Sequence, residues 1–186
     1  MLAGANALRS LAGHRREALW QAVGAAPDRD LLRPTTVQED TPRLAAPSEG
    51  EEIVGDYRAQ GLTLGRHPLA LLREQLLAQR FMPASTLMDY QNGQLARACG
   101  MVTVRQRPGT AKGVLFMTLE DETGNVNVIV WPSLVEQQRH EVLNAPLLGV
   151  YGIWQKEGEV RHLVAKRLVD MSHLLGGLHA PSRDFC

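Results

Sequence analysis

The spacing of the hydrophobic residues changes near Asn92. Before this residue, leucines recur every three or four positions, as in "RHPLALLREQLLAQRF", which is typical of a helix with one buried face. After it, apolar and polar residues alternate, as in "VLFMTLE" and "NVNVIVW", which is typical of strands. The pattern therefore predicts a mainly β chain with an α-helical N-terminal part.

Short helices are expected in the first sixty residues. Between residues 6 and 23 the helical pattern is interrupted at Gly13, which predicts two helices that are too small to bury a core of their own. Ser48, followed three residues later by Glu51, has the spacing of a capping box. Gly61 is placed to end the helix that this box begins.

A proline-rich stretch separates these helices. Residues 24–47 contain four prolines and few bulky apolar side chains, which is typical of a linker. A further helix is expected to begin near Pro68 and to stop at Pro83. The expected organisation is residues 1–24 as the end of a helical region, 25–47 as a linker, 48–92 as a two-helix connector, 93–172 as a β domain and 173–186 as a tail.

The β domain has a particular order of elements. Three strands are expected in "ARACGMVTVR", "VLFMTLE" and "NVNVIVW", then a helix in "PSLVEQQRHEVL", then two strands in "LLGVYGIWQK" and "VRHLVAKRLVDM". A helix between the third and fourth of five strands is the order of the OB-fold, a five-stranded Greek-key barrel. The fold class is therefore predicted to be an OB-fold preceded by helices.

Charge and cysteine content argue against several classes of protein. Twenty Lys and Arg residues balance twenty Asp and Glu residues, which argues against a strongly basic nucleic-acid binder but leaves room for a local basic face. Cys99 and Cys186 are far apart and have no neighbours at ligand spacing, so no disulfide framework and no zinc site is expected. No apolar run reaches the length of a membrane span, and a cytoplasmic protein is expected.

The acidic run Glu120, Asp121 and Glu122 raises the possibility of a metal site. Metal-dependent phosphoryl transfer needs carboxylates that converge from separate elements on one point. These three are consecutive, so they should alternate faces or splay into water at the turn "DETG". The run is therefore interpreted as a hairpin turn, and no metal ligand and no catalytic residue is predicted.

Binding residues are expected on the loop after the first strand and on the last hairpin. OB-folds hold single strands by stacking bases on exposed aromatic rings while basic side chains follow the phosphates. The candidate nucleic-acid contacts are Arg105, Arg107, Lys112, Phe116, Trp154, Lys156, Arg161 and Lys166. Trp131 is expected to be buried, whereas Phe116 and Trp154 are each open to a core or a surface role.

The segment "EQLLAQRF" loosely resembles a peptide that binds a sliding clamp. Its leucines also fit the buried stripe of a helix, and this second interpretation is favoured.

Three runs carry a family resemblance. They are "DYRAQGLTLGRHPLALLR", "GMVTVRQRPGTAKGVLFMTLEDETGNVNVIVWP" and "GEVRHLVAKRLVDMSHLLG", and they resemble the C-terminal part of the bacterial error-prone DNA polymerases. These are damage-inducible relatives of the DNA polymerase III alpha subunit in the C family. The resemblance covers about residues 48–185, and the opening helices resemble the end of that family's helix-hairpin-helix region.

The resemblance implies a role in DNA repair and translesion DNA replication. The family's nucleotidyltransferase activity depends on two Mg²⁺ ions held by aspartates of a palm domain, which no residue of this sequence matches. No cofactor and no catalysis are therefore expected in this chain alone. The implied partners are single-stranded template DNA, the catalytically dead Y-family-like and RecA-like accessory proteins, and the sliding clamp.

The sequence departs from the family pattern at both ends. The chain begins within the helix-hairpin-helix region, so its duplex-binding hairpins are expected to be absent or incomplete. Cys186 stands where similar sequences carry His. The leading hypothesis is weak, sequence-indifferent contact with single-stranded DNA in a translesion polymerase. The alternative is a protein-docking module that recruits accessory factors and binds little DNA.

Overall fold

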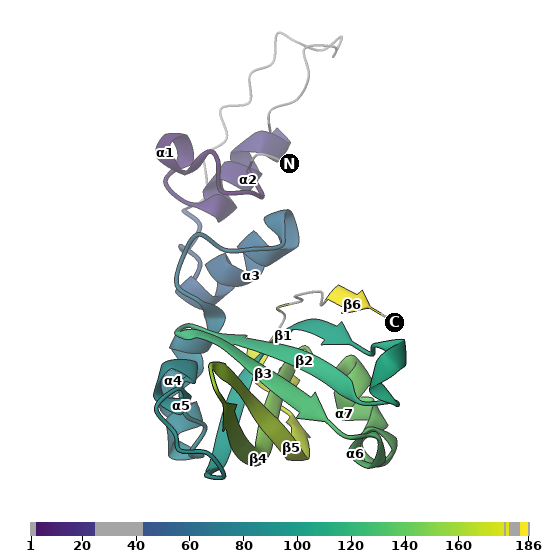
Figure 1. The fold of residues 1–186 in the computed structure, drawn as a ribbon. Coiled ribbons are helices and arrows are strands. Elements are labelled where there is room, and N and C mark those ends of the chain that lie inside the picture. Colours follow the sequence, from purple (N-terminus) through teal and green to yellow (C-terminus); the bar gives the residue numbers. More distant parts are fainter. Residues whose placement is uncertain (1–2, 25–42, 177, 179–182, 186) are drawn as a thin grey trace, which may run out of the picture. The chain divides into compact units, whose positions relative to one another are not determined.

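The structure, a computed structural model, describes residues 3–24, 43–176, 178 and 183–185 (Figure 1). The chain forms two compact units, Met1–Leu62 and Thr63–Cys186. Most of the expected linker, residues 25–42, lies outside the described residues, as do residues 177, 179–182 and 186 of the expected tail.

The described residues of the first unit form three helices. They are α1 (Arg9–Ala12), α2 (Arg15–Gly24) and α3 (Glu49–Gln60). Gly13 has a positive φ of 77° between α1 and α2, so the expected interruption is present. At α3, Ser48 and Glu51 form the expected capping box, and Gly61 ends the helix in the left-handed conformation.

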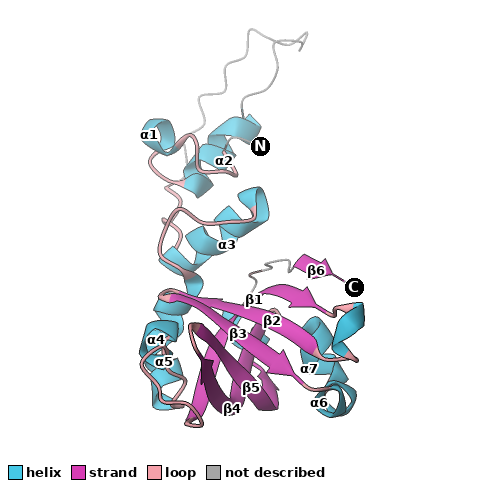
Figure 2. Ribbon diagram, in the orientation of Figure 1, coloured by secondary structure: helices cyan, strands magenta, loops and turns pink. Residues whose placement is uncertain are grey.

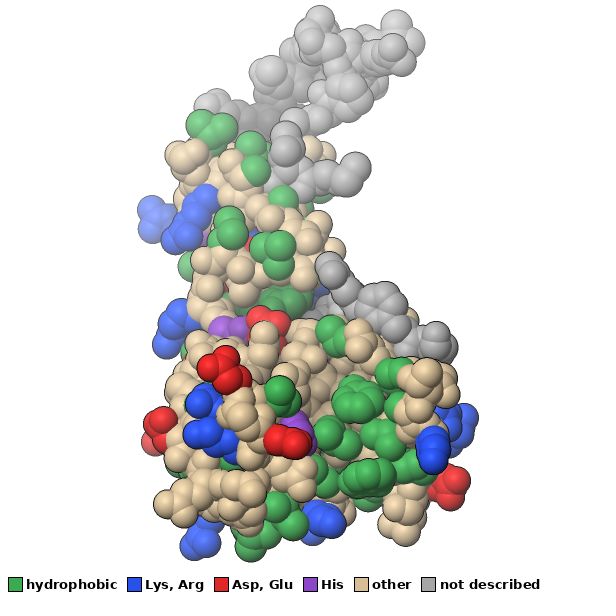
Figure 3. All heavy atoms as spheres, viewed as in Figure 1, with side chains coloured by type: hydrophobic (Ala, Val, Ile, Leu, Met, Phe, Trp, Pro, Cys, Tyr) green, Lys and Arg blue, Asp and Glu red, His purple; other side chains and the backbone are tan. Residues whose placement is uncertain are grey.

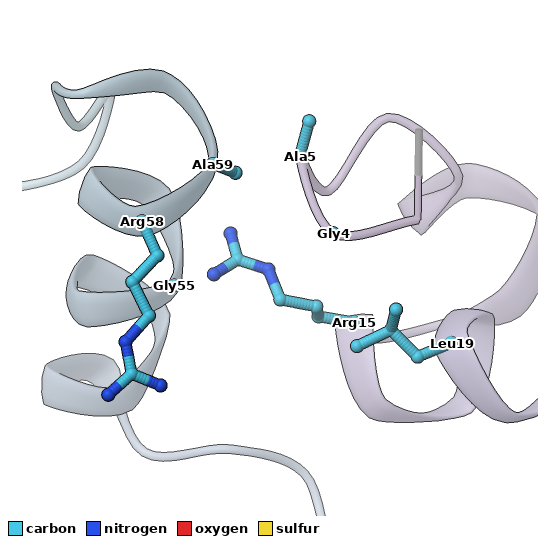
Figure 4. Close-up of a pocket in the computed structure, with 7 residues that line it drawn as sticks. All are labelled: Gly4, Ala5, Arg15, Leu19, Gly55, Arg58 and Ala59. Atoms are coloured by element: carbon cyan, nitrogen blue, oxygen red, sulfur yellow. The ribbon is translucent and has the colours of Figure 1, made fainter. Parts of the chain in front are cut away.

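Arg15 fastens α2 to α3. Its guanidinium donates to the Glu52 carbonyl at 2.9 Å and forms ion pairs with the Glu52 and Asp56 carboxylates. Figure 4 shows this side chain reaching toward Gly55, where an added Cβ would lie 1.6 Å from Arg15 Nη1. The apolar cluster here is small, with only alanines fully buried in it. A buried ion pair therefore supplies the connection that large apolar side chains supply elsewhere.

The second unit is built around a barrel whose elements agree with the expected order (Figure 2). They are α4 (Pro68–Ala78), α5 (Ala84–Leu87), β1 (Leu95–Gln106), the 3-10 turn η1 (Gly109–Ala111), β2 (Leu115–Asp121), β3 (Gly124–Val130), α6 (Pro132–Gln137), α7 (Arg139–Asn144), β4 (Leu147–Glu157), β5 (Val160–Asp170), the 3-10 turn η2 (Ser172–Leu175) and β6 (Arg183–Phe185).

The sheet closes on itself. The strands pair in the order β2, β3, β5, β4 and β1, and β1 pairs again with β2. This closed five-stranded barrel confirms the predicted OB-fold. The helix expected after Pro132 is two helices, because Gln138 leaves helical geometry with φ −121° and ψ 44°. The short strand β6, which runs parallel to β1, was not predicted.

Closure depends on β1. Its first half, Leu95–Met101, pairs with β4, and its second half, Met101–Gln106, pairs with β2. The register shifts between Val102 and Val104, as expected where a bulge bends a strand. At Gly100 an added Cβ would lie 2.8 Å from the Leu119 side chain. Only glycine leaves room for the bend at this point.

The barrel interior is filled by one apolar cluster. It includes Val126, Val128 and Val130 from β3 and Trp154 from β4, all of them nearly inaccessible to solvent. The helix stripe in "EQLLAQRF" is also buried, since Leu76 and Phe81 are both 0% exposed. These two side chains are therefore not available to bind a partner such as a clamp.

The acidic run at the β2–β3 turn behaves differently from the prediction. The turn is present, but its carboxylates do not all splay into water. Asp121 is 6% exposed. It accepts hydrogen bonds from the Ala84 amide at 2.8 Å, the Thr123 amide and hydroxyl at 2.7 Å, and Arg73 at 3.0 Å. One buried carboxylate therefore fixes the turn, the start of α5 and the middle of α4.

Glu122 completes this arrangement. Its two oxygens accept from Arg73 Nε at 2.5 Å and Nη2 at 2.8 Å, a bidentate geometry that is stronger than a neutral hydrogen bond. Burial opposes the ionised form of Glu122, but the hydrogen bonds and charge of Arg73 prevail, so its pKa is lowered from its ordinary value. In the part of the chain that the structure describes, no group of three or more His, Cys, Asp or Glu could hold a metal ion.

We expect Asp121→Asn to lower the free energy of unfolding by about 2–4 kcal/mol, because the substitution turns one acceptor into a donor among buried donors. Urea denaturation of the full chain, followed by circular dichroism, measures the loss. Glu120→Gln is the matched control: Glu120 is about half exposed, and its contact with His67 is 4.0 Å long, so the loss should stay below about 1 kcal/mol. Equal losses in both variants would contradict this account.

The Glu122–Arg73 pair should make stability depend on pH. Because the folded pKa of Glu122 is depressed, its contribution is complete above the ordinary value of 4.5 and is lost as the pH falls through the folded value. Glu122→Gln should therefore cost about 1–2 kcal/mol near neutral pH and less near pH 3, below the ordinary pKa of 4.5. Urea midpoints at both pH values test this, and a cost that does not change with pH would refute it.

Candidate nucleic-acid interface

The outer face of β2 and β3 carries exposed aromatic and apolar side chains. Phe116 is 39% exposed and pairs directly with Ile129, and side chains of directly opposed residues share one face. Thr118 and Asn127 form the next outward pair along the two strands. Of the two roles left open for Phe116, the structure therefore shows the surface one, on the face that OB-folds use for oligonucleotides.

Trp131 lies on this face, against the prediction that it is buried. It is 52% exposed, and its backbone is extended, with φ −72° and ψ 152°. Since Val126, Val128 and Val130 point into the barrel, alternation directs Trp131 outward, two residues beyond Ile129. Phe116 and Trp131 are thus the aromatic side chains available to stack on bases at this end of the barrel.

Trp154, in contrast to Trp131, is buried. Its side chain is 0% exposed and lies within the interior cluster. It has the same strand parity as Val150, which is also fully buried. The prediction of Trp154 as a base-contacting residue is therefore wrong, because a base could reach it only by opening the core.

The loop between β1 and β2 returns to the start of α6. Lys112 and Gly113 both have positive φ, 48° and 86°, which turns the chain sharply before β2. A Cβ at Gly113 would lie 3.5 Å from Arg107 Nη2 and 3.4 Å from the Pro132 ring. Arg107 therefore lies near the residue that follows Trp131, and Arg107 and Lys112 are both exposed.

Arg105 binds the end of α7 and does not make the predicted nucleic-acid contact. It is 6% exposed and donates to the carbonyls of Val142 at 2.8 Å and Ala145 at 2.6 Å. These carbonyls lie at the C-terminal end of α7, where a cation is favourable. Burial lowers the pKa of Arg105, and the Asp184 carboxylate at 3.6 Å opposes that shift.

The β4–β5 hairpin has mixed charge. Lys156 pairs with Arg161 in the strand register. Lys156 is exposed and Arg161 is half-buried, and the tip between them carries Glu157 and Glu159. The eighth candidate, Lys166, is exposed but lies further along β5. The structure thus groups Arg107, Lys112 and Phe116, and it places the other exposed candidates elsewhere.

An apolar row continues from Phe116 around the outside of the barrel. In the strand registers, Phe116 pairs with Ile129, Ile129 with Val164, Val164 with Ile153, and Ile153 with Leu95. We call these five residues the outer apolar row. Figure 3 shows hydrophobic side chains gathered over β2 and β3 on one face of the barrel. This composition is unusual because outward positions of a small barrel are commonly polar.

Comparison with known proteins agrees with this geometry. Residues 96–170 match the family model of the OB-fold nucleic acid binding domain. In both fold and sequence the barrel is thus similar to OB-fold nucleic acid binding domains.

Nearly the whole chain is also similar to error-prone DNA polymerases. The protein of that name from Bordetella parapertussis is 62% identical over 99% of this chain, and the one from Ralstonia nicotianae is 60% identical over 100% of it. The match confirms the resemblance carried by the sequence motifs. In each case the chain spans only 18% of the relative's length.

A solved structure is similar in fold over a shorter range. The asparaginyl-tRNA synthetase from Pyrococcus horikoshii matches 49% of this chain and 21% of its own chain, with 20% identity and a TM-score of 0.39. The family model and the relatives together support a nucleic-acid-binding role related to DNA polymerases. Among the described residues, no helix has the length and apolar character needed to cross a membrane.

Acrylamide quenching of fluorescence can test that Trp131 is exposed and Trp154 is buried. Trp20 and Trp131 are each 52% exposed, and Trp154 is 0% exposed. Trp131→Phe should remove quenchable emission, so the remaining emission becomes harder to quench. Trp154→Phe should have the opposite effect. Equal quenching in the two variants, with unchanged circular dichroism, would contradict the assigned positions.

Proposed function

We propose that the chain binds single-stranded DNA across the β2–β3 face of its barrel and serves template-directed synthesis past DNA damage. The observation that carries the proposal is the pair of exposed aromatic side chains, Phe116 and Trp131, beside the basic residues Arg107 and Lys112. Stacked bases and neutralised phosphates are the two contacts that hold single strands on OB-folds without sequence preference.

The geometry supports this combination. Residues two apart on an extended chain are about 7 Å apart, so Ile129 and Trp131 present their side chains in sequence along one face. Phe116 lies beside Ile129 on the neighbouring strand. Two bases can therefore occupy adjacent positions, and each stacked base typically contributes about 1–3 kcal/mol.

The similarity to error-prone DNA polymerases supports the biological part of the proposal. Relatives of that name are 56–62% identical to this chain. In the proposed arrangement, catalysis and its Mg²⁺ ions belong to other parts of such a polymerase, and this segment holds the template strand.

A second candidate function, docking of an accessory protein of the mutagenic complex, is favoured by the outer apolar row. Apolar surface of this kind, although interrupted at Val164, which is 7% exposed, suits a protein partner as well as a nucleic acid. The balanced net charge of the chain is also compatible with such a partner. Salt dependence separates the two functions, because phosphate contacts release counterions and apolar docking does not.

We expect Phe116→Ala and Trp131→Ala each to weaken binding of a fluorescent oligothymidine by about fivefold to a hundredfold. Fluorescence anisotropy with the full chain, at about 50 mM and about 200 mM salt, measures this loss. Arg107→Gln with Lys112→Gln should also flatten the salt dependence. Arg105 is a poor target for this test, because its removal leaves the α7 carbonyls without their donor.

Trp20→Ala is the matched control, because Trp20 has the same 52% exposure as Trp131 but lies in the other unit. It should leave the affinity unchanged. Oligothymidine binding that is absent, or that is insensitive to salt and to both barrel substitutions, would reject the DNA function and favour docking.

A further inference from the structure

A second basic surface lies on the barrel, away from the loop between β1 and β2. Arg97 of β1, Tyr151 of β4 and Arg167 of β5 follow one another in the strand registers, so their side chains share the outer face. The Arg97 guanidinium carbon lies 4.9 Å from the centre of the Tyr151 ring, and that of Arg167 lies 5.7 Å from it. Tyr151 therefore has a cation on each side.

This cluster borders a hollow of about 210 Å³. The lining residues are Leu95, Ala96, Arg97, Tyr151, Gly152 and Lys166. The volume is below the range of about 300–1,000 Å³ that is typical of small-molecule sites. It suits a single phosphate group with part of its sugar.

A bulge in β5, opposite Tyr151 and Gly152 of β4, shapes the hollow. The β4–β5 register shifts between Tyr151 and Gly152, and Lys166 is left between the pairs formed by Arg167 and Ala165. Such a bulge re-aims the side chain that it carries, here toward the hollow. At Gly152 an added Cβ would lie 2.2 Å from the Val164 carbonyl oxygen. Only glycine therefore lets β4 and β5 approach this closely beside the bulge.

The three cations have no ion-pair partner among the residues that the structure describes. Arg97 donates one hydrogen bond, to the Gln79 carbonyl at 3.2 Å. The remaining N–H groups of Arg97, together with Arg167 and Lys166, are free to bind an anion. The Tyr151 ring packs in a T-shaped arrangement with the buried Phe81 ring, and the ring centres are 5.3 Å apart. The cluster is therefore organised before any ligand arrives.

We propose that Arg97, Lys166 and Arg167, arranged around Tyr151, form a second phosphate-binding site for a nucleic-acid strand. Arginine forks match the oxygen geometry of phosphate, and a lysine ammonium adds a mobile charge. Leu95, which lines the hollow, is the last residue of the outer apolar row that begins at Phe116. Four steps of about 4.8 Å between neighbouring strands make this row about 19 Å long. A strand lying on the β2–β3 face can follow the accessible members of this row, past buried Val164, to the second site.

This inference rests on the proposed binding of single-stranded DNA, so the test uses two strand lengths. Single OB-folds occupy about 4–16 nucleotides. An oligothymidine of about 3 nucleotides is too short to cross the row and should fill only the Phe116–Trp131 face, whereas one of about 16 should reach the second site. Arg167→Gln and Lys166→Gln should each weaken the longer strand about three- to tenfold and leave the shorter one unchanged. Each lost contact should reduce the salt slope by about 0.7.

Arg58→Gln is the matched control, since it removes one exposed charge from the other unit and should change neither affinity. Titration of the isotope-labelled chain with inorganic phosphate gives a readout that does not need DNA. The amide signals of Tyr151, Gly152 and Lys166 should shift, and Arg167→Gln should reduce those shifts.

The outcomes separate the two proposals. If the short oligothymidine binds and depends on Phe116, but the long one ignores Arg167→Gln and Lys166→Gln, the second site is overturned and the DNA function stands. Phosphate shifts without any oligothymidine binding would mean a site for free anions and would overturn both proposals for DNA.

Discussion

The barrel depends on the double pairing of β1. One strand must hydrogen-bond to β4 along its first half and to β2 along its second half, so it has to bend sharply while staying in both ladders. Gly100 and the bulge after Val102 make that bend possible. Without closure, the strands would form an open sheet with free edges. The outward positions would then no longer follow one another around a cylinder.

Closure also sets where charge and aromatic surface lie. The bend carries Arg105 to the barrel end, where it meets the carbonyls of α7. It leaves Arg107 two residues later on the exposed loop. Arg105 and Arg107, two residues apart, therefore have different roles. Arg105 binds the end of α7, and Arg107 is available to a ligand. A chain with no net charge can still offer local positive surfaces in this way.

The strand order, the barrel and most helix ends could be predicted from the sequence, because each depends on local periodicity, capping or turn chemistry. The signal for Trp131 and Trp154 was also present. Trp131 has the parity opposite to Val126, Val128 and Val130, and Trp154 has the parity of Val150. Alternation along the strands therefore gives the right assignment for both tryptophans.

Other features could not be found this way, because they depend on contacts between distant segments. Nothing local indicates that Arg73, nearly fifty residues earlier, neutralises Asp121 and Glu122. The positions of Arg97, Tyr151 and Arg167 likewise depend on the register of three strands. A register shift of one residue would place them on opposite faces.

The buried carboxylate at the β2–β3 turn limits how the barrel can diversify. A turn that also anchors two helices cannot accept extra residues without releasing Asp121 from the Ala84 amide and from Arg73. The β4–β5 tip has no comparable anchoring role, since a Cβ added at Gly158 would meet no atom within 4 Å. Insertions among homologues should therefore be tolerated beside Gly158 and rejected at Thr123.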